Sequence, residues 1–170
     1  RIGNIGFKAV SSAGHTPEHL SYLVTDFGGG ATEPMALFTG DFIFVGDVGR
    51  PDLAQKGAEI TMQDLAGMMF DSIHNKLFPL PDEVIVYPAH GAGSSCGKNL
   101  GKETFSTIGE QKKHNYALQA ATKEEFIKAV TTGIAAPPQY FPINAKINKE
   151  GYDSLDKVLI NGMRALTVEE

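Results

Sequence analysis

The stretch ALFTGDFIFVGDVG, residues 36–49, decides how the chain is expected to fold. Its apolar run is broken at Thr39, Gly40 and Asp41. This pattern is typical of a buried strand that ends in a polar turn. Asp41 is therefore expected at the end of a strand, where loops carry functional side chains on a rigid support.

Strand-like segments lie on both sides of this stretch. Residues 6–12 and 19–27 are rich in β-branched and aromatic residues. Residues 84–87 form a short apolar run that leads into a Pro-Ala-His-Gly turn. These segments predict further strands, each ending in a loop that contains glycine.

Two helices are expected between and after the strands. Apolar residues recur at helical spacing within residues 60–78, where Thr61 can cap the helix and Asp64 follows three residues later. A second capping box, Thr122 with Glu125, predicts another helix start. The alternation of strands and helices indicates an α/β protein.

Composition excludes several classes of protein. The 170 residues are 42% hydrophobic, enough for one core. A net charge of -5 without a basic stripe argues against nucleic acid as a partner. No apolar run approaches the roughly 18 residues that span a bilayer. The single cysteine, Cys96, cannot form an internal disulfide, which fits a reducing cytoplasm. The chain begins without methionine, and we expect an excised piece of a longer protein.

A candidate metal site follows from the strand ends. His15, Asp41 and His90 each follow an apolar segment in a turn that contains glycine. Two imidazoles and a carboxylate suit zinc or non-haem iron. The alternatives are hydrogen-bonded structural histidines and a turn-forming aspartate. His15 and His19 do not form a helical zinc motif, because Pro17 stands between them.

Three motifs carry a resemblance to a known family. They are GHTPEH at 14–19, FTGDFIFVGDVGRPDL at 38–53 and YPAHGAGSSCGK at 87–98. Together they resemble the metallo-β-lactamase superfamily, and within it the persulfide dioxygenases of the bacterial type that is fused to a rhodanese domain. The resemblance covers roughly residues 1–145.

The resemblance implies an αββα sandwich, of which this chain is the C-terminal portion. Residues 1–135 would belong to that domain, and residues 136–165 would be an extended linker toward a rhodanese domain. Residues 166–170 would begin the rhodanese domain itself. The proline-rich, aperiodic stretch at 134–151 independently favours a linker or an extended tail.

The resemblance also assigns metal ligands. In the family the histidine of the GHT motif and the aspartate of the TGD motif bind the metal, which matches His15 and Asp41. A further ligand comes from an upstream HxHxDH motif that this sequence lacks, so an N-terminal segment would have to supply it. His90 matches a ligand of the second metal in dinuclear hydrolases, and a residue lining the site in the dioxygenases. The remaining histidines have no constellation around them and are expected at the surface: His19, His74 and His114.

Two further residues are candidates for catalytic roles. Arg50 matches an arginine near the thiol substrate, where a guanidinium would pair with a carboxylate or phosphate of the carrier. Its alternative role is a structural ion pair with Asp47 or Asp52. Cys96 lies in a loop of glycine and serine, where Lys98 would stabilise its thiolate and make it a persulfide acceptor. Its alternative role is that of a small buried residue.

The function implied is that of a persulfide dioxygenase. Such an enzyme oxidises a low-molecular-weight thiol persulfide, of the glutathione, coenzyme A or bacillithiol type, with O2 to sulfite and thiol at one non-haem iron(II). Zinc(II) is the alternative metal, and the expected partners are the N-terminal segment, a rhodanese domain and further copies of the chain. The alternatives are a glyoxalase II-like thioester hydrolase with two metals, and an inactive fragment whose metal site is incomplete.

Overall fold

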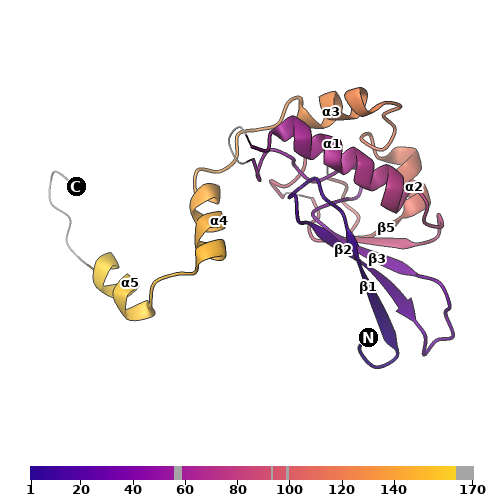
Figure 1. Ribbon diagram of the computed structural model, residues 1–170, viewed down its shortest axis with the longest axis horizontal. Coiled ribbons are helices and arrows are strands. Elements are labelled where there is room, and N and C mark those ends of the chain that lie inside the picture. The colour runs from indigo at the N-terminus through magenta and orange to yellow at the C-terminus, as the bar shows by residue number, and fades with distance from the viewer. Residues whose placement is uncertain (56–58, 93, 99, 164–170) are drawn as a thin grey trace. The chain divides into compact units, whose positions relative to one another are not determined.

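The structure is a computed structural model that describes residues 1–55, 59–92, 94–98 and 100–163 (Figure 1). It forms two compact units, residues 1–135 and 136–170. The first unit contains β1 (Ile5–Ser11), β2 (Leu20–Asp26), β3 (Ala36–Gly40), α1 (Met62–Ser72), the π-helix η1 (Ile73–Leu77), β4 (Ile85–Pro88), β5 (Ser106–Thr107), α2 (Ile108–His114) and α3 (Lys123–Thr131). The second contains α4 (Phe141–Glu150) and α5 (Leu155–Gly162).

The five strands form one sheet in the order β1-β2-β3-β4-β5. β1, β2 and β3 pair antiparallel, β4 runs parallel to β3, and β5 closes the sheet antiparallel to β4. The parallel pair needs a crossover connection, and α1 provides it. Consequently β1, β3 and β4 point in the same direction, and their C-terminal ends lie at one edge of the sheet.

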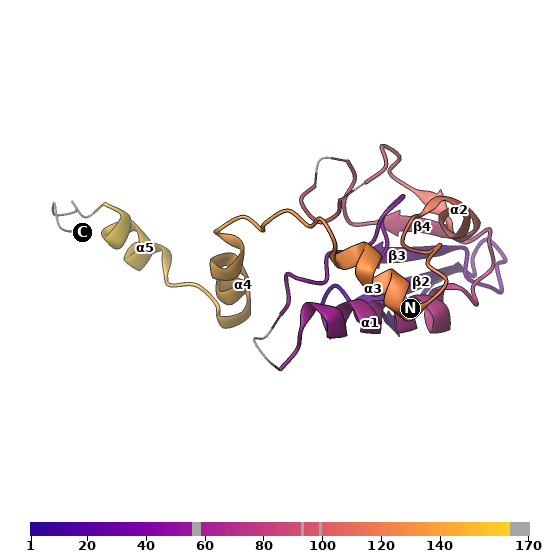
Figure 2. The same ribbon diagram turned by 90° about the horizontal axis from the view of Figure 1, so that it is seen from above.

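Helix α1 covers one face of the sheet, and α3 lies beside α1 (Figures 1 and 2). The rings of Phe70 in α1 and Phe126 in α3 meet edge to face, with centroids 5.6 Å apart. The core beneath joins the sheet to these helices through buried apolar side chains: Leu23, Leu37, Phe42, Ile43, Ala66, Met69, Ile73, Val86, Ile108, Phe126 and Val130. The stretch at 36–49 therefore behaves as predicted, with β3 ending at Gly40 and a fully buried run resuming at Phe42.

The opposite face of the sheet is apolar and exposed. Because side chains alternate along strands, the register Tyr22↔Phe38↔Tyr87 places three rings on this one face. These three side chains, together with Phe7 and Leu20, are 37 to 46% exposed. This is the face on which an αββα sandwich carries its second sheet.

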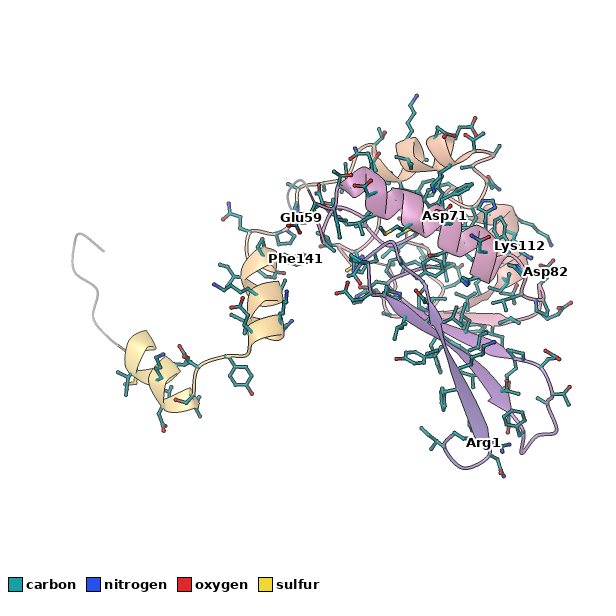
Figure 3. The ribbon with its side chains drawn as sticks, viewed as in Figure 1. Arg1, Glu59, Asp71, Asp82, Lys112 and Phe141 are labelled. Carbon is teal, nitrogen blue, oxygen red and sulfur yellow. The ribbon has the colours of Figure 1, made fainter. Side chains whose placement is uncertain are left out.

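The predicted helix starts are confirmed. Thr61 accepts a hydrogen bond from the N–H of Asp64, whose carboxylate accepts one from the N–H of Thr61. Thr122 and Glu125 form the same capping box at α3. The first helix continues through η1 to Leu77, so the predicted span of 60–78 is close to the observed one. In α2, Lys112 donates to the carboxylate of Asp82 at 2.6 Å, which ties this helix to the turn before β4 (Figure 3).

The second unit corrects one prediction. Residues 136–165 were expected to be an extended linker, whereas 141–150 and 155–162 are helical. Pro142 lies in the first turn of α4, where a missing N–H leaves no hydrogen bond unmade, so this proline is compatible with helix. The expected start of a rhodanese domain at 166–170 lies outside the described residues. Within the described ranges, every helix is too short or too polar to cross a lipid bilayer.

Candidate metal centre

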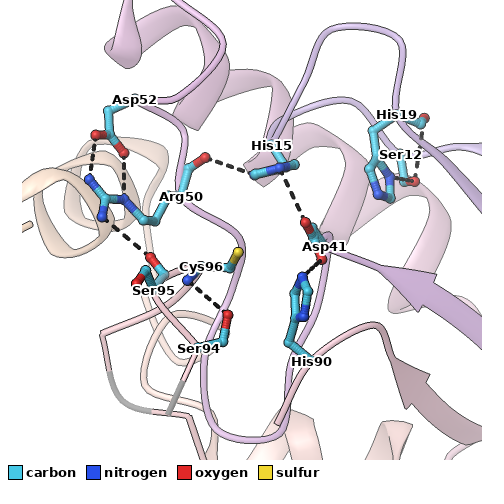
Figure 4. Close-up of polar contacts among 10 residues, drawn as sticks. All are labelled: Ser12, His15, His19, Asp41, Arg50, Asp52, His90, Ser94, Ser95 and Cys96. Atoms are coloured by element: carbon cyan, nitrogen blue, oxygen red, sulfur yellow. Dashed lines mark hydrogen bonds and ion pairs between the residues drawn. The ribbon is translucent and has the colours of Figure 1, made fainter. Parts of the chain in front are cut away.

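Three loops bring the predicted metal ligands together at one edge of the sheet. His15 lies in the turn after β1, Asp41 follows β3 directly, and His90 lies two residues beyond β4. The shared direction of these three strands places the loops side by side. Strand ends thus deliver both imidazoles to one carboxylate, as Figure 4 shows.

The carboxylate of Asp41 stands between the two imidazoles. Its Oδ2 lies 3.4 Å from Nε2 of His15, and its Oδ1 lies 3.3 Å from Nε2 of His90. The His15 side chain is 13% exposed, Asp41 22% and His90 42%. The site is therefore closed at His15 and open to solvent at His90.

A backbone carbonyl fixes the tautomer of His15. Nδ1 of His15 lies 3.0 Å from the carbonyl oxygen of Arg50. Because a carbonyl only accepts, Nδ1 must carry the proton, and in the neutral ring Nε2 offers its lone pair to Asp41. Two lone-pair-bearing atoms that face each other need a cation or a proton between them.

The residues present fit a metal ion. Oδ1 of Asp41 is buried and receives no hydrogen bond from the described residues. The other oxygen, Oδ2, faces the unprotonated Nε2 of His15 at 3.4 Å. A carboxylate with one oxygen short of a donor and the other beside an unprotonated imidazole nitrogen offers a set of nitrogen and oxygen ligands that suits iron(II) or zinc(II). His15 and Asp41 would hold the ion, and Nε2 of His90 would face the other oxygen of the same carboxylate.

Cys96 reaches this site from the loop after β4. Its Sγ and the donor atoms of Asp41 and His90 all lie within 4.8 Å of one another. The N–H of Cys96 donates to Oγ of Ser94 at 3.1 Å, which shapes the turn that carries the thiol. The ammonium of Lys98 donates to main-chain carbonyls near the C-terminal end of α3, those of Ala129 and Thr132.

The guanidinium of Arg50 is buried and engaged by protein groups. It forms a two-point pair with Asp52, through Nε at 3.0 Å and a terminal nitrogen at 2.7 Å. The terminal nitrogens also donate to the carbonyls of Ser95 at 3.3 Å and Ala135 at 2.6 Å. The Arg50 side chain is 5% exposed. Arg50 therefore supports His15 through its own carbonyl and the Cys96 loop through its guanidinium.

Asp47, which lies between Asp41 and Arg50 in the sequence, has a structural role. It is buried, and its carboxylate accepts hydrogen bonds from the N–H groups of Val48 at 2.8 Å and Lys98 at 2.5 Å. The side-chain amide of Asn115 donates to the carbonyl of Asp47 at 2.8 Å. Burial, together with the charge of Asp47 nearby, raises the pKa of the Tyr116 phenol.

Gly49 allows two segments of the site to touch. A Cβ at this position would lie 1.8 Å from the carbonyl oxygen of Asp41 and 3.1 Å from Cβ of His15. No side chain fits there, so the strand end that carries Asp41 and the segment that leads to Arg50 approach each other only because residue 49 is glycine.

The prediction that His19 lies at the surface is wrong. Its ring is partly buried, Nδ1 lies 2.8 Å from Oγ of Ser12, and Ser12 in turn contacts Oγ of Ser21 at 2.8 Å. Burial, followed by the nearby His15, lowers the pKa of His19. The pairing of β1 with β2 sets this contact, because the antiparallel register that ends at Ser11↔Leu20 places residues 12 and 19 opposite each other.

The two other histidines differ from each other. His114 is exposed as predicted. His74 is partly buried, with its ring between those of Phe70 and Phe78 at centroid distances of 4.0 and 4.7 Å. Its expected exposure is therefore wrong, because the helical spacing that placed it on α1 and η1 also places it between aromatic neighbours four residues away on either side.

Known proteins resemble the chain at several levels. No family model matches it. A crystal structure of a metallo-β-lactamase from Staphylococcus aureus subsp. aureus COL superposes with a TM-score of 0.80 and 44% identity, over 90% of this chain and 43% of that one. The chain has a metallo-β-lactamase fold. The fold class expected from the resemblance is therefore confirmed, and the described residues contribute one five-stranded sheet with helices to it.

Two curated relatives of this chain carry different activities in their names. The mitochondrial persulfide dioxygenase ETHE1 of Mus musculus is 30% identical over 148 residues, which is 87% of this chain and 49% of the relative. The hydroxyacylglutathione hydrolase GloC of Haemophilus influenzae is 28% identical over 115 residues, which is 68% of this chain and 42% of the relative. The chain thus spans less than half the length of each of these two relatives. These likenesses support a place in the metallo-β-lactamase superfamily and an enzyme at that level.

Proposed function

We propose that the chain forms part of a persulfide dioxygenase. The observation that carries the proposal is the donor pair of His15 and Asp41, in which the carbonyl of Arg50 leaves Nε2 of His15 free for a metal ion. The likeness to a mammalian persulfide dioxygenase supports the same reading. The reaction takes one O2 and one water per thiol persulfide and releases thiol, sulfite and two protons.

The chain's own residues would hold and shield the reacting groups. Iron(II) bound there would supply the redox chemistry that joins oxygen to sulfur. His15 and Asp41 would hold the ion at the closed end of the site. The exposed side at His90 leaves the approach through which a small thiol persulfide would enter.

For Arg50 we propose a positioning role. The guanidinium already pairs with Asp52 and with two main-chain carbonyls, so a carboxylate on the substrate would have to displace a partner. Arg50 instead fixes Ser95, the neighbour of Cys96, against the segment that holds His15. Its effect on the reaction would therefore pass through the placement of these two residues.

For Cys96 we propose the role of a sulfur acceptor. Its thiol lies beside Asp41 and His90, where the substrate would be bound. Attack of its thiolate on the outer sulfur of the persulfide releases the carrier thiol and leaves a persulfide on Cys96. That sulfur could then pass to a rhodanese domain. Mass spectrometry after exposure to glutathione persulfide would show one added sulfur, which dithiothreitol removes.

A thioester hydrolase is the second candidate, and one observation favours it. The two oxygens of Asp41 face different imidazoles, at 3.4 and 3.3 Å, so this carboxylate would help to hold one ion with His15 and a second ion with His90. The likeness to a hydroxyacylglutathione hydrolase supports this reading. In it His90 binds a metal, whereas in the dioxygenase it only lines the site.

Oxygen uptake separates the two candidates. The chain is loaded with iron(II) under nitrogen and given glutathione persulfide while O2 and sulfite are measured; a zinc-loaded sample is given S-lactoylglutathione. Persulfide-dependent uptake supports the dioxygenase, and thioester cleavage without uptake supports the hydrolase. In the dioxygenase His90→Ala keeps measurable uptake, and in the hydrolase it abolishes cleavage. His114→Ala, a change of an exposed histidine, is the matched control.

Absence of both activities would support the third reading, that these residues alone form an incomplete site. Metal binding distinguishes this outcome from a misfolded sample. A chain that binds one ion through His15 and Asp41 but turns over neither substrate would retain the ligands and lack the remaining groups of the active site.

A further inference from the structure

His19 is a partly buried imidazole beside the candidate metal centre that the proposed function does not use. Its ring meets the ring of His15 edge to face, with centroids 6.3 Å apart and planes at 86°. On another side it lies beside the ring of Phe42, again with centroids 6.3 Å apart, and Phe42 directly follows Asp41. His19 therefore lies against the segments that carry both ligands.

The ring of His19 also occupies the space beside Gly40. A Cβ on Gly40 would lie 2.8 Å from Nε2 of His19 and 3.2 Å from its Cε1. Gly40 has a φ of 54°, a conformation that residues with a side chain rarely adopt. Because Gly40 directly precedes Asp41, the imidazole packs against the backbone from which the Asp41 carboxylate projects.

Two buried hydroxyl groups hold the ring in this orientation. Oγ of Ser12 lies 2.8 Å from Nδ1 of His19 (Figure 4). The same oxygen lies 2.8 Å from Oγ of Ser21, and Ser12 and Ser21 are each 1% exposed. The N–H of Ser12 donates to the carbonyl of His19 at 2.9 Å, so backbone and side chain join the same two residues. Breaking the Nδ1 contact would leave a buried polar group short of a partner, so the ring stays in place.

Further polar contacts continue from the serines to the end of β3. Oγ of Ser21 lies 3.5 Å from the carbonyl oxygen of Thr39, which is fully buried and stands two residues before Asp41. The hydroxyl of Thr39 donates to the carbonyl of Ile43 at 2.6 Å and lies 3.3 Å from that of Tyr87 in β4. Side chains thus connect the turn after β1 to the strand end that carries Asp41.

We propose that His19 is a positioning residue that sets the separation of His15 and Asp41. Its ring stands between the turn that carries His15 and the backbone of Gly40, and acts as a spacer of fixed size between them. A binding site needs its donor atoms held to within about 0.5 Å, so a displaced carboxylate lowers affinity for the ion. The inference rests on the proposed function only through the metal ion that His15 and Asp41 would hold, whichever reaction follows.

The contacts of His19 separate this role from that of a further ligand. Nδ1 is paired with Ser12, and Nε2 faces the main chain of Gly40. The ring therefore acts by its volume and by the Ser12 contact, and a replacement that keeps a ring in this place should retain most of the effect. A ligand would lose its effect with its nitrogen atoms.

Zinc(II) affinity, measured by chelator competition, tests the two roles. His19→Ala removes the ring and should weaken binding by about 10- to 100-fold, as is usual for residues that orient metal ligands. His19→Phe keeps a ring against Gly40 and should bind within about 3-fold of the unaltered chain. His114→Ala, a change of an exposed histidine, is the matched control and should leave the affinity unchanged. Equal losses in His19→Ala and His19→Phe would show a ligand and overturn the spacer.

A double-mutant cycle shows whether His19 acts through Asp41. Asp41→Asn removes the charged ligand, so adding His19→Ala to it should cost little further affinity for zinc(II). A merely structural role would lower the affinity by the same factor in both backgrounds, and that result would overturn the proposal. Urea denaturation of each variant shows that the folded fraction is the same during the titrations.

Crystal structures of the metal-free unaltered chain and of His19→Ala give a readout that needs neither metal binding nor activity. We expect the separation of Nε2 of His15 from Oδ2 of Asp41, 3.4 Å in the unaltered chain, to change by more than about 0.5 Å. An unchanged separation would overturn the proposal. If the unaltered chain binds no metal ion, the proposed function fails while this separation still decides the role of His19. Where His19→Ala does not fold, His19→Asn, which keeps an amide for Ser12 and removes the ring, takes its place.

Discussion

Asp41 and Asp47 both follow a glycine in the same stretch of the chain, yet the protein uses them in opposite ways. Asp47 is buried among donors, with two N–H groups on its carboxylate. Asp41 faces two imidazoles and keeps one buried oxygen without a hydrogen bond from the described residues. The difference shows two uses of a Gly-Asp turn. Where the fold leaves the carboxylate short of hydrogen-bond donors, the aspartate is available as a metal ligand, and where the fold supplies those donors, the aspartate supports the structure.

The largest effect on stability is expected at Asp47. Asp47→Ala leaves the N–H groups of Val48 and Lys98 without their acceptor in a buried position, and each such group costs about 1 to 3 kcal/mol. We expect the free energy of unfolding to fall by about 3 kcal/mol or more in urea denaturation. Asp82→Ala, which removes an exposed carboxylate, is the control and should change it by less than about 1 kcal/mol. Equal losses would contradict the contrast.

The reverse pattern is expected at Asp41. Asp41→Asn keeps the shape and removes the charge, so zinc affinity should fall by about 100-fold, or about 2.7 kcal/mol. The free energy of unfolding should change by less than about 1 kcal/mol, because Oδ1 has no hydrogen bond to lose. Chelator competition measures the first quantity and urea denaturation the second. A stability loss as large as that of Asp47→Ala would make Asp41 a structural residue.

Arg50→Lys separates a side chain from its backbone. Lysine cannot reproduce the two-point pair with Asp52 and the bonds to Ser95 and Ala135, so we expect a stability loss of about 2 kcal/mol. The carbonyl of residue 50 remains, so Nδ1 of His15 should stay protonated. Nitrogen-15 chemical shifts of the imidazole report this proton. A change of tautomer would show that the side chain, and not the main chain, controls His15.

The smallest effect is expected at a fully exposed carboxylate. Hydrogen bonds from the hydroxyl and N–H of Thr61 lower the pKa of Asp64 below its ordinary 3.8. The pKa of Asp64 is lower in the folded chain than in the unfolded chain. The capping contribution is therefore fully present above the unfolded value of 3.8 and is lost as pH falls through the folded pKa. The difference in urea midpoint between the wild-type chain and Asp64→Asn should shrink as pH drops below 3.8. A difference that is constant with pH would exclude the charge as its source.

Local features were predictable from the sequence because their partners are close along the chain. The capping boxes at Thr61 and Thr122 each involve a residue three positions away. The grouping of His15, Asp41 and His90 followed from one general property, that strands pointing the same way end at the same edge. Their roles as metal ligands stay a prediction that metal analysis would test.

Contacts between distant residues that follow from no such general property were not predictable. The guanidinium of Arg50 meets carbonyls 45 and 85 residues further along the chain, and neither a charge nor a motif marks those positions. The burial of His19 depends on strand register, which the alternation of apolar residues alone did not specify. Helix α4 was missed because residues 134–151 are rich in proline and lack apolar periodicity, although the first helical turn tolerates Pro142.

The approach of Gly49 to Asp41 affects how a mutational scan of this chain should be interpreted. Any substituted Cβ would be pushed against the carbonyl of Asp41, so a variant at position 49 would displace the carboxylate without removing a donor atom. In a screen that scores function alone, Gly49 would be grouped with the ligands themselves. Sensitivity to substitution at position 49 therefore measures the space between two backbone segments. Only a metal-binding assay on a variant in which that spacing is restored distinguishes such a residue from one that touches an ion.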